Sequence, residues 1–448
     1  MNHPSRDSAL QVWIDWLLSL HAQEIDLGLE RVAQVADKLK ISRPAPFVIS
    51  VAGTNGKGSS VAMLTSTLKA AGYSVGTYSS PHILRFNERI QVDGQMVEDQ
   101  TIIDAFLEIE LSRGDIKLTY FEFSTLAALL IFKQNRVEVA VLEVGLGGRL
   151  DAVNIVDADA ALITAIDVDH IDWLGSDRSV IATEKAGICR SSKPAICSDP
   201  NPPQSLFDYA QNLKIPLFTL GRDFTFEKNQ QACQDSAQTE SWTVAFKSDS
   251  DRFSWPEVDG KCLPLPVLKG ELQLQNAAGV VALLAQIQSE LPVSYAALCK
   301  GLKSVVHPGR LQPLLVKKQA WLVDVAHNPQ SAEVLADYLS VQKLSHRYQA
   351  IFSVLNDKDS LPMIKLLKPY IQTWFIADLA IPRSTSASEL KALLLQADIP
   401  AAAICVVESI DHALERVVLN QVNPVLVWGS FFTVSQALVG LHHREWLS

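Results

Sequence analysis

The sequence of 448 residues lacks any apolar run near the roughly 18–20 residues needed to cross a membrane. It also lacks a run of Lys and Arg, and its formal net charge is −10. An acidic chain of this kind argues against nucleic acid as the main partner. The first seven residues are polar, and no apolar signal region follows them. We therefore expect a cytoplasmic protein without membrane partners.

Cysteine pairs are absent as well. The six cysteines are scattered, and none belongs to a C-x-x-C pair. This spacing predicts idle thiols in a reducing compartment rather than a disulfide or zinc framework. Repeats and low-complexity tracts are also missing, whereas 48% of the residues are hydrophobic and 20% are charged. The chain can therefore bury large cores, and its length predicts two or three domains.

The most informative stretch is the glycine-rich segment Val51-Ala-Gly-Thr-Asn-Gly-Lys-Gly-Ser-Ser60. It follows a short apolar run and precedes a helical pattern, and a strand, a glycine loop and a helix start together present backbone N–H groups to phosphate. Lys57 would reach the terminal phosphates, and Ser59 or Ser60 could place a hydroxyl on Mg²⁺. Gly58 interrupts the usual spacing between lysine and serine. The alternative is a glycine-rich turn with a solvated lysine.

Polar residues end the neighbouring predicted strands. Ser80 follows the run 74–78, Glu143 lies near the end of the run 137–144, and His170 follows the run 160–166. In a parallel sheet these carboxyl ends form one edge, where ligands bind. A buried carboxylate such as Glu143 is costly unless it is paired or bound to a metal. Taken alone, however, Ser80 could be a turn serine and His170 a structural histidine.

Three further segments have two interpretations each. Residues 26–31 could form a substrate loop or a helix start. Thr119 and Glu122 have the spacing of a helix capping box, which explains them without a ligand. Lys185 lies on a predicted helix that begins around Asp177, and it could be an ordinary surface lysine.

The rest of the chain divides into a β-rich flap over 201–269, two helices, and a hinge at His307-Pro-Gly-Arg310. After the hinge, five predicted strands alternate with five helices, which is typical of a second, smaller parallel-sheet domain. We therefore expect an α/β protein with domains 1–306 and 307–448. His327 and Asn328 precede Pro329, which suits a first helical turn, so a helix start there could receive an anion.

Seven segments together carry a family resemblance: Gly53-Thr-Asn-Gly-Lys-Gly-Ser59, Tyr78-Ser-Ser-Pro-His82, Leu142-Glu-Val-Gly-Leu-Gly-Gly-Arg-Leu-Asp-Ala152, Asp169-His170, Glu184-Lys-Ala-Gly-Ile188, His307-Pro-Gly-Arg310 and Asp324-Val-Ala-His-Asn-Pro329. In this order they resemble the folylpolyglutamate synthases of the Mur-ligase superfamily, over nearly the whole chain. Leu118-Thr-Tyr-Phe-Glu122 resembles the bifunctional bacterial form, which also makes dihydrofolate from dihydropteroate. The resemblance implies a P-loop-type ATPase domain with a parallel sheet and a smaller Rossmann-like domain.

The resemblance also implies a role for each site residue. Nucleotide would be held by Thr54, Asn55, Gly56, Lys57, Gly58, Ser59, Asn276, Arg310 and Asp324. The Mg²⁺ ligands would be Ser80, Glu143 and His170, and K⁺ could be a second cation. Lys57, Lys185 and His327 would be catalytic, with Lys185 carbamylated. The pterin site would be lined by Glu24, Ile25, Asp26, Leu27, Thr119, Tyr120, Phe121, Glu122, Leu150, Asp151 and Ala152.

The activity implied is the ATP-dependent addition of L-glutamate to dihydropteroate and to tetrahydrofolates through an acyl phosphate. We expect a monomer whose partners are small molecules: ATP, folates and L-glutamate. Two other functions remain open. A peptidoglycan-precursor ligase of the same superfamily would use the same chemistry, and a nucleotide-dependent switch would hydrolyse ATP without ligation.

Overall fold

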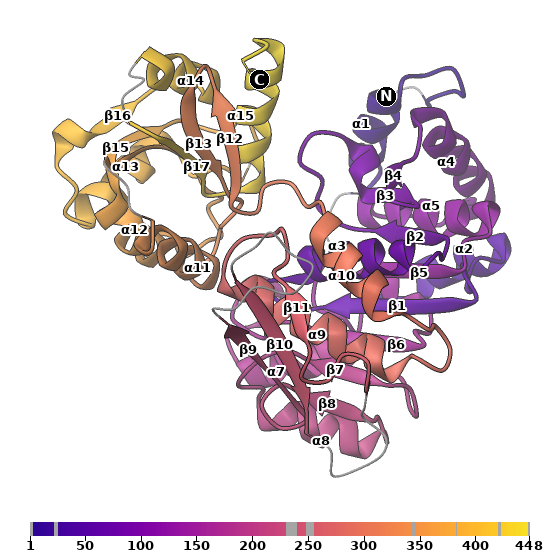
Figure 1. Cartoon of the computed structure of the whole chain (residues 1–448). Coiled ribbons are helices and arrows are strands. Elements are labelled where there is room, and N and C mark those ends of the chain that lie inside the picture. Colours follow the sequence, from indigo (N-terminus) through magenta and orange to yellow (C-terminus); the bar gives the residue numbers. More distant parts are fainter. Residues whose placement is uncertain are drawn as a thin grey trace. The chain divides into compact units, whose positions relative to one another are not determined.

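The structure is a computed structural model that describes residues 3–21, 26–229, 240–247, 255–342, 346–381, 383–419 and 423–446. The chain forms two compact units (Figure 1). The first contains residues 1–82, 86–267 and 274–306, and the second contains 83–85, 268–273 and 307–448. Residues 83–85 and 268–273, which precede the main part of the second unit in the sequence, therefore belong to that unit.

The first unit is built on an eight-stranded sheet with the strand order β4-β3-β2-β5-β1-β6-β7-β8. The six strands from β2 to β8 in this order are parallel, and β3 and β4 add an antiparallel edge. The strands are β1 (Phe47–Ala52), β2 (Val75–Tyr78), β3 (Ile90–Val92), β4 (Gln95–Met96), β5 (Val139–Glu143), β6 (Ala160–Ile163), β7 (Ala195–Cys197) and β8 (Leu217–Thr219). Strands β1 and β5 are almost fully buried, which explains their continuous apolar runs.

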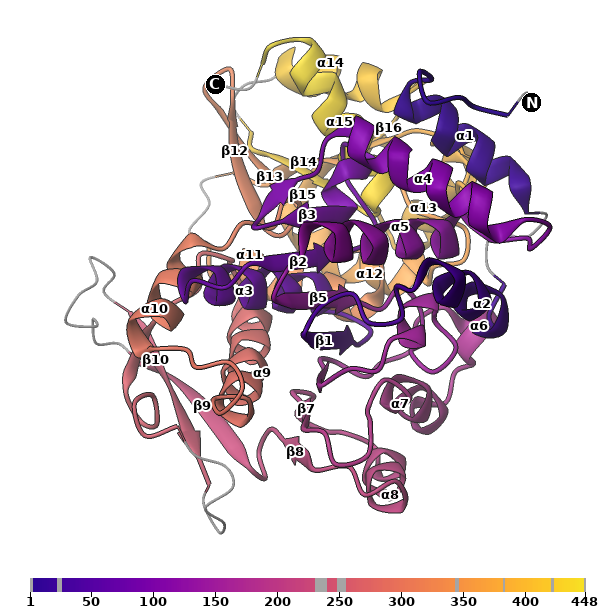
Figure 2. The same cartoon turned by 90° about the vertical axis from the view of Figure 1, so that its right-hand side faces the viewer.

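Helices and short 3₁₀ turns connect and cover these strands. They are α1 (Leu10–Leu20), α2 (Glu30–Leu39), α3 (Lys57–Ala70), η1 (Phe86–Arg89), α4 (Asp99–Arg113), α5 (Tyr120–Asn135), η2 (Ala152–Ile155), α6 (Ile171–Leu174), α7 (Arg178–Ala186), α8 (Gln204–Asn212), α9 (Glu271–Gln286) and α10 (Tyr295–Ser304). Helices α1, α2, α4 and α5 pack together beside β2 and β3 (Figure 2). Helices α3 and α10 lie side by side, because Gly301 has no side chain to separate them from Thr67.

The predicted β-rich flap over 201–269 is partly wrong. Helix α8 and strand β8 lie in this segment, and β8 pairs with β7 in the main sheet. Only a small antiparallel sheet, β11-β10-β9, is separate, with β9 (Phe224–Asn229), β10 (Ser241–Phe246) and β11 (Cys262–Pro264). Residues 230–239 and 248–254 of the predicted flap lie outside the described residues.

The second unit has a six-stranded sheet with the order β12-β13-β17-β14-β15-β16. Five strands are parallel, and β12 pairs antiparallel with β13 at one edge. Its strands are β12 (Gln312–Val316), β13 (Gln319–Val323), β14 (Tyr348–Phe352), β15 (Ile371–Ile376), β16 (Ile404–Val406) and β17 (Val425–Trp428). Its helices are α11 (Pro329–Ser340), α12 (Ser360–Leu367), η3 (Lys368–Tyr370), α13 (Ala387–Gln396), η4 (Ala401–Ala403), α14 (Ile410–Leu419) and α15 (Phe431–His443).

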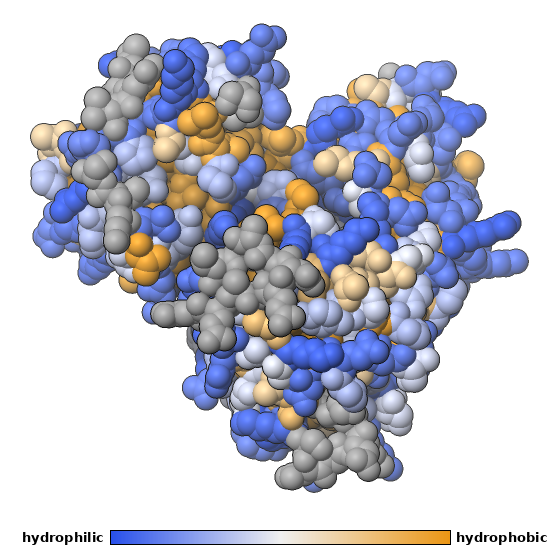
Figure 3. Space-filling view, in the orientation of Figure 1, coloured by the Kyte–Doolittle hydropathy of each residue, from blue (hydrophilic) through white to orange (hydrophobic). Residues whose placement is uncertain are grey.

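The α/β class and both parallel sheets are confirmed, and in the second unit β12 is the strand that the sequence pattern missed. Two apolar clusters, which include Trp374 and Trp428 in one and Trp321 in the other, form the core of the second unit. Polar residues dominate most of the face in Figure 3, with apolar side chains gathered on part of the second unit. No helix in the described ranges is long and apolar enough to cross a membrane.

Candidate active site

The glycine loop of the first unit is held in a conformation that only glycine fits. Gly53 and Gly56 have φ of 155° and 89°. A Cβ at Gly53 would lie 1.8 Å from Thr164 Oγ1, and one at Gly56 would lie 2.3 Å from Asn276 Oδ1. The loop therefore packs tightly against residues that are distant in the sequence, and Asn276, which is fully buried, is one of them.

Hydrogen bonds from the end of β6 fix the same loop. The Thr54 amide donates to Ala165 O at 2.6 Å, and the Thr164 hydroxyl donates to Asn55 O at 2.6 Å. The Thr54 hydroxyl also donates to Asp167 O at 2.8 Å. Sequence reasoning missed Thr164, because a threonine at the end of a strand carries no signal of its own. The loop is thus preformed, which suits a phosphate cradle.

Lys57 begins α3 and folds back over the loop. Its Nζ donates to Gly53 O at 2.9 Å and to Thr54 O at 3.2 Å. Ser59 and Ser60 follow in the first turn of α3, and both are buried. Their hydroxyl oxygens have no hydrogen-bond partner among the described residues. Buried hydroxyls of this kind fit a site that receives a polar ligand, such as a phosphate with its metal ion.

The four strands that sequence analysis assigned to one edge are adjacent, in the order β2-β5-β1-β6. Glu143 ends β5 opposite Val51 of β1, and it is buried with 4% of its surface exposed. The Ser80 amide donates to Glu143 Oε2 at 3.2 Å, so these two predicted metal ligands lie together. His170 follows β6 with φ of 53°, and its amide donates to Asp169 Oδ1. Within the described ranges, no three His, Cys, Asp or Glu residues form a ready metal cluster.

Lys185 is buried, with 2% of its surface exposed, so the alternative of an ordinary surface lysine is wrong. It lies on α7, which begins as expected after Asp177, whose carboxylate accepts from the Ser179 amide at 2.8 Å. Burial, together with the smaller effect of the positive charge of Lys57, lowers the pKa of Lys185 to about 7, and Asp169 opposes the shift. A lysine with this pKa is partly neutral near pH 7, and its amine can then act as a nucleophile.

Asp151 is the buried acid of the same region. Burial raises its pKa to about 6, while backbone N–H groups and the charge of Lys57 act in the opposite direction. Its two oxygens accept from the amides of Leu146, at 2.9 Å, and Val153, at 3.0 Å. Asp151 thereby shapes the loop after β5 and starts η2, which contains Ala152.

The predicted pterin segments are joined by an arginine. The capping box of Thr119 and Glu122 at the start of α5 is confirmed, with Glu122 N donating to Thr119 Oγ1 and Thr119 N to Glu122 Oε2. Glu122 also pairs with Arg31 at 3.1 Å, and Arg31 pairs with Asp26 at 2.8 Å. Residues 26–28 therefore lie beside the start of α5 as well as before α2. Glu24 and Ile25 lie outside the described residues.

Aromatic side chains adjoin these segments. The ring of Tyr120 packs against Phe86, and the ring of Phe121 packs against Tyr78. A Cβ on Gly145 would lie 2.6 Å from Phe121 Cζ, so the loop after β5 also touches this group. Leu27 and Leu150 are partly exposed.

Arg310, Asp324 and His327 belong to the second unit. Asp324 follows β13, is buried, and accepts from the amides of Leu311 and Ala326 at 2.8 and 2.7 Å. Burial raises its pKa, and the charge of Arg310 opposes the shift. The guanidinium of Arg310 lies over the ring of Phe431, which also packs against His327. The helix start predicted at Asn328 and Pro329 is confirmed by a capping box with Ser331.

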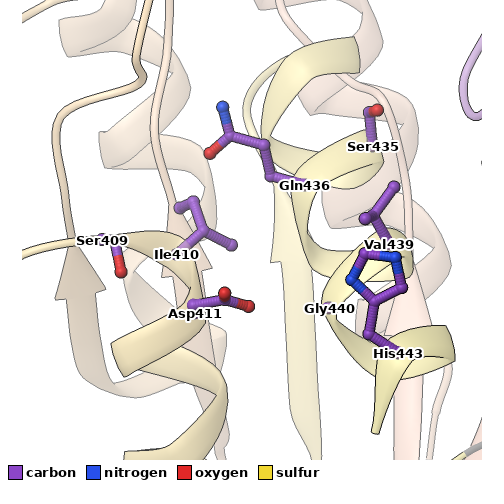
Figure 4. A pocket seen from close by; sticks show the side chains of 8 residues that line it. All are labelled: Ser409, Ile410, Asp411, Ser435, Gln436, Val439, Gly440 and His443. Carbon is purple, nitrogen blue, oxygen red and sulfur yellow. The ribbon is translucent and has the colours of Figure 1, made fainter. Parts of the chain in front are cut away.

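The second unit also has a cavity of about 280 Å³ that involves no predicted site residue. It lies between the start of α14 and α15, and Asp411, Gln436 and His443 are among its lining residues (Figure 4). Asp411 is paired with Arg444 at 2.8 Å. The geometry at the glycine loop, and not this cavity, defines the candidate active site.

Comparison with known proteins agrees with this geometry. Residues 51–284 match the Mur ligase middle domain, and residues 309–431 match the Mur ligase glutamate ligase domain. The fold and the glycine-loop site thus define a two-domain Mur ligase. The chain is 41% identical to the dihydrofolate synthase/folylpolyglutamate synthase of Escherichia coli K12 over 442 residues, covering 99% of this chain and 98% of the relative. The chain belongs to the dihydrofolate synthase/folylpolyglutamate synthase family.

Solved structures support the same assignment. E. coli FolC in complex with DHPP and ADP matches with a TM-score of 0.87 and 40% identity, over 99% of this chain and 100% of that chain. The bifunctional folylpolyglutamate synthase/dihydrofolate synthase of Yersinia pestis, complexed with AMPPNP and a Mn ion, matches with a TM-score of 0.85 and 39% identity, over 98% and 100%.

Proposed function

We propose that this chain is an ATP-dependent ligase that adds L-glutamate to dihydropteroate and to tetrahydrofolate mono- and polyglutamates. The observation that carries the proposal is the group formed by Lys57 and the buried residues Lys185 and Asp151 beside a preformed glycine loop. Membership of the dihydrofolate synthase/folylpolyglutamate synthase family supports the choice of substrates.

Amide formation from a carboxylate needs a leaving group, which ATP supplies. A carboxylate oxygen of the pterin substrate attacks the γ-phosphorus, the bond to the β-phosphate oxygen breaks, and ADP leaves. The amino group of L-glutamate then attacks the acyl carbon, phosphate leaves, and the amine loses a proton. The ammonium of Lys57 offsets the repulsion between the two anions in the first step. His327 and Arg310 add positive charge from the second domain.

The nucleotide is held in this proposal by residues of both domains. The triphosphate lies on the loop residues Thr54, Asn55, Gly56, Lys57, Gly58 and Ser59, and Asn276, Arg310 and Asp324 contact the nucleotide. The first domain, 1–306, binds ATP, metal and pterin, and the second, 307–448, is the glutamate-ligase domain.

Mg²⁺ would be held by Ser80, Glu143 and His170. Glu143 fits this role because it is a buried carboxylate that already accepts from the Ser80 amide. When bound, Mg²⁺ supplies a positive charge that stabilises the phosphates. K⁺ is a second cation in this proposal.

Lys185 is carbamylated. The neutral Nζ adds to the carbon of CO₂, a nitrogen–carbon bond forms, and one proton leaves to solvent. The product is a carboxylate in place of a buried cation, which removes the repulsion between Lys185 and Lys57.

The pterin site is formed by Glu24, Ile25, Asp26, Leu27, Thr119, Tyr120, Phe121, Glu122, Leu150, Asp151 and Ala152. The enzyme acts as a cytoplasmic monomer.

The test is ADP release by the purified protein. Release that requires both dihydropteroate and L-glutamate supports the ligase, whereas release that needs neither indicates a nucleotide-dependent switch. Lys57→Ala should lower turnover by about 100-fold or more. The matched control is Lys69→Ala on the same helix, where the lysine is exposed. Undiminished turnover in Lys57→Ala would remove this lysine from the mechanism.

A further inference from the structure

Arg89 is a buried cation without a buried anion. It ends η1, and only 7% of its surface is exposed, which makes it the one buried arginine within the described ranges. Its Nε donates to His82 Nδ1 at 2.8 Å. No carboxylate in the described part of the chain lies within ion-pairing distance, and its terminal nitrogens donate to no described atom.

Other arginines that are less buried have acidic partners. Arg31 pairs with Asp26 and Glu122, Arg113 with Glu110. Removing a guanidinium from water without a counter-ion is costly, so a protein that does so usually supplies the anion in another form. His82 cannot supply it, because an imidazole is either neutral or positively charged and here only accepts the hydrogen bond from Arg89 Nε.

Two aromatic rings flank the guanidinium. Its Cζ lies 5.2 Å from the ring centre of Tyr120 and 5.7 Å from that of Phe86. The two rings are themselves in edge contact, with centres 6.0 Å apart. Cation–π contacts fix the plane of the guanidinium, but they provide no negative charge. The fork of terminal nitrogens is therefore preorganised for a planar anion.

The position of Arg89 places this fork beside the candidate active site. Its carbonyl accepts from the Ser79 amide at 3.0 Å, and the next residue, Ser80, donates to Glu143. Tyr120, which packs on the guanidinium, belongs to the segment 119–122 that sequence analysis assigned to the pterin substrate. Phosphate has its own cradle in the glycine loop, so the anion that remains to be held is a carboxylate.

We propose that Arg89 binds the carboxylate of the pterin substrate and orients it for attack on ATP, with Phe86 and Tyr120 holding the guanidinium in place. This inference rests on the proposed function, and it adds a specificity-determining residue to the site. Dihydropteroate has a single carboxylate, so it is the reacting group that Arg89 would contact.

The test compares dihydropteroate with its neutral carboxamide, each titrated into the full-length protein in the presence of ADP. The wild type should bind the acid roughly 10- to 100-fold more tightly than the amide, as expected for hydrogen bonds to a charged group. In Arg89→Met this preference should fall to about one, while affinity for ADP is unchanged. Arg89→Lys should keep part of the preference, because it keeps the charge but loses the fork.

Arg113→Met is the matched control, because Arg113 is also largely buried but pairs with Glu110 on its own helix. It should retain the full preference. Equal loss of acid and amide affinity in Arg89→Met would show a structural role and overturn the proposal. If that variant does not fold, a wild type that fails to prefer the acid overturns it instead. A wild type that neither binds dihydropteroate nor releases ADP with it contradicts the proposed function itself.

Discussion

Lys57 and Lys185 are two lysines of the first unit that interact electrostatically, although they lie 128 positions apart in the sequence. The charge of Lys57 adds to the effect of burial and brings the pKa of Lys185 to about 7. The helix that begins at Lys57 and the helix that ends at Ala186 thus deliver their amines to one region.

The pH dependence of the free energy of unfolding should show the deprotonation of Lys185. Above pH 7 its amine is neutral in the folded chain, whereas in the unfolded chain it stays protonated until about pH 10.4. The unfolded state then binds one more proton, so the free energy of unfolding should rise with pH by about 1.4 kcal/mol per unit across that window. Below pH 7 both states are protonated and this contribution has no slope.

Urea unfolding at pH 6 to 9 in CO₂-free buffer measures this effect. Lys185→Met should lack this contribution. The difference in the free energy of unfolding between wild type and variant should therefore change by roughly 2–3 kcal/mol between pH 7 and 9. Parallel pH profiles for the two proteins would mean that Lys185 is not the buried titrating group.

Bicarbonate should activate the wild type. If the Lys185 amine must take up CO₂, an enzyme stripped of CO₂ should lose most of its ADP release and regain it on addition of bicarbonate. The response should weaken below pH 7, because the protonated amine cannot add to CO₂. Lys185→Met should be inactive with or without bicarbonate. Full activity in a CO₂-free wild type would contradict carbamylation.

We expect that Gly56 cannot be replaced. A second glycine, Gly72, separates the two reasons for this, which are the strained φ and the contact with Asn276. Gly56→Ala introduces a strained φ of 89° and a Cβ 2.3 Å from Asn276 Oδ1, so both stability and ATP affinity should fall. Gly72→Ala has a similar φ of 100° but no atom within 4 Å of the new Cβ. It should cost about 1 kcal/mol of stability and leave the KM for ATP unchanged. Equal KM values in both variants would show that the contact with Asn276 does not shape the nucleotide site.

Sequence patterns predicted the elements that have strong local signals. The glycine loop, the buried strands β1 and β5, and the capping box at Thr119 each follow from residue type and spacing. The partners of the loop could not be predicted, because Thr164 and Asn276 reach it only through the folded sheet. The burial of Lys185 was hidden for the same reason: the α7 pattern does not say what covers its inner face. Strand β12 was missed because its alternate residues are exposed and Pro313 lies within it.

The two helix caps at Thr119 and Ser294 offer a matched test of the pterin segment. Both residues accept a hydrogen bond from the third helical amide, and each lies at the start of a helix in the first unit. Thr119→Ala and Ser294→Ala should therefore each cost about 1 kcal/mol of stability by thermal unfolding. Only Thr119→Ala should raise the KM for dihydropteroate, because its cap also positions Glu122, which pairs with Arg31. The KM for ATP should stay the same in both variants. A rise in the KM for dihydropteroate in Ser294→Ala, or none in Thr119→Ala, would mean that the start of α5 acts only as a helix end and that the pterin lies elsewhere.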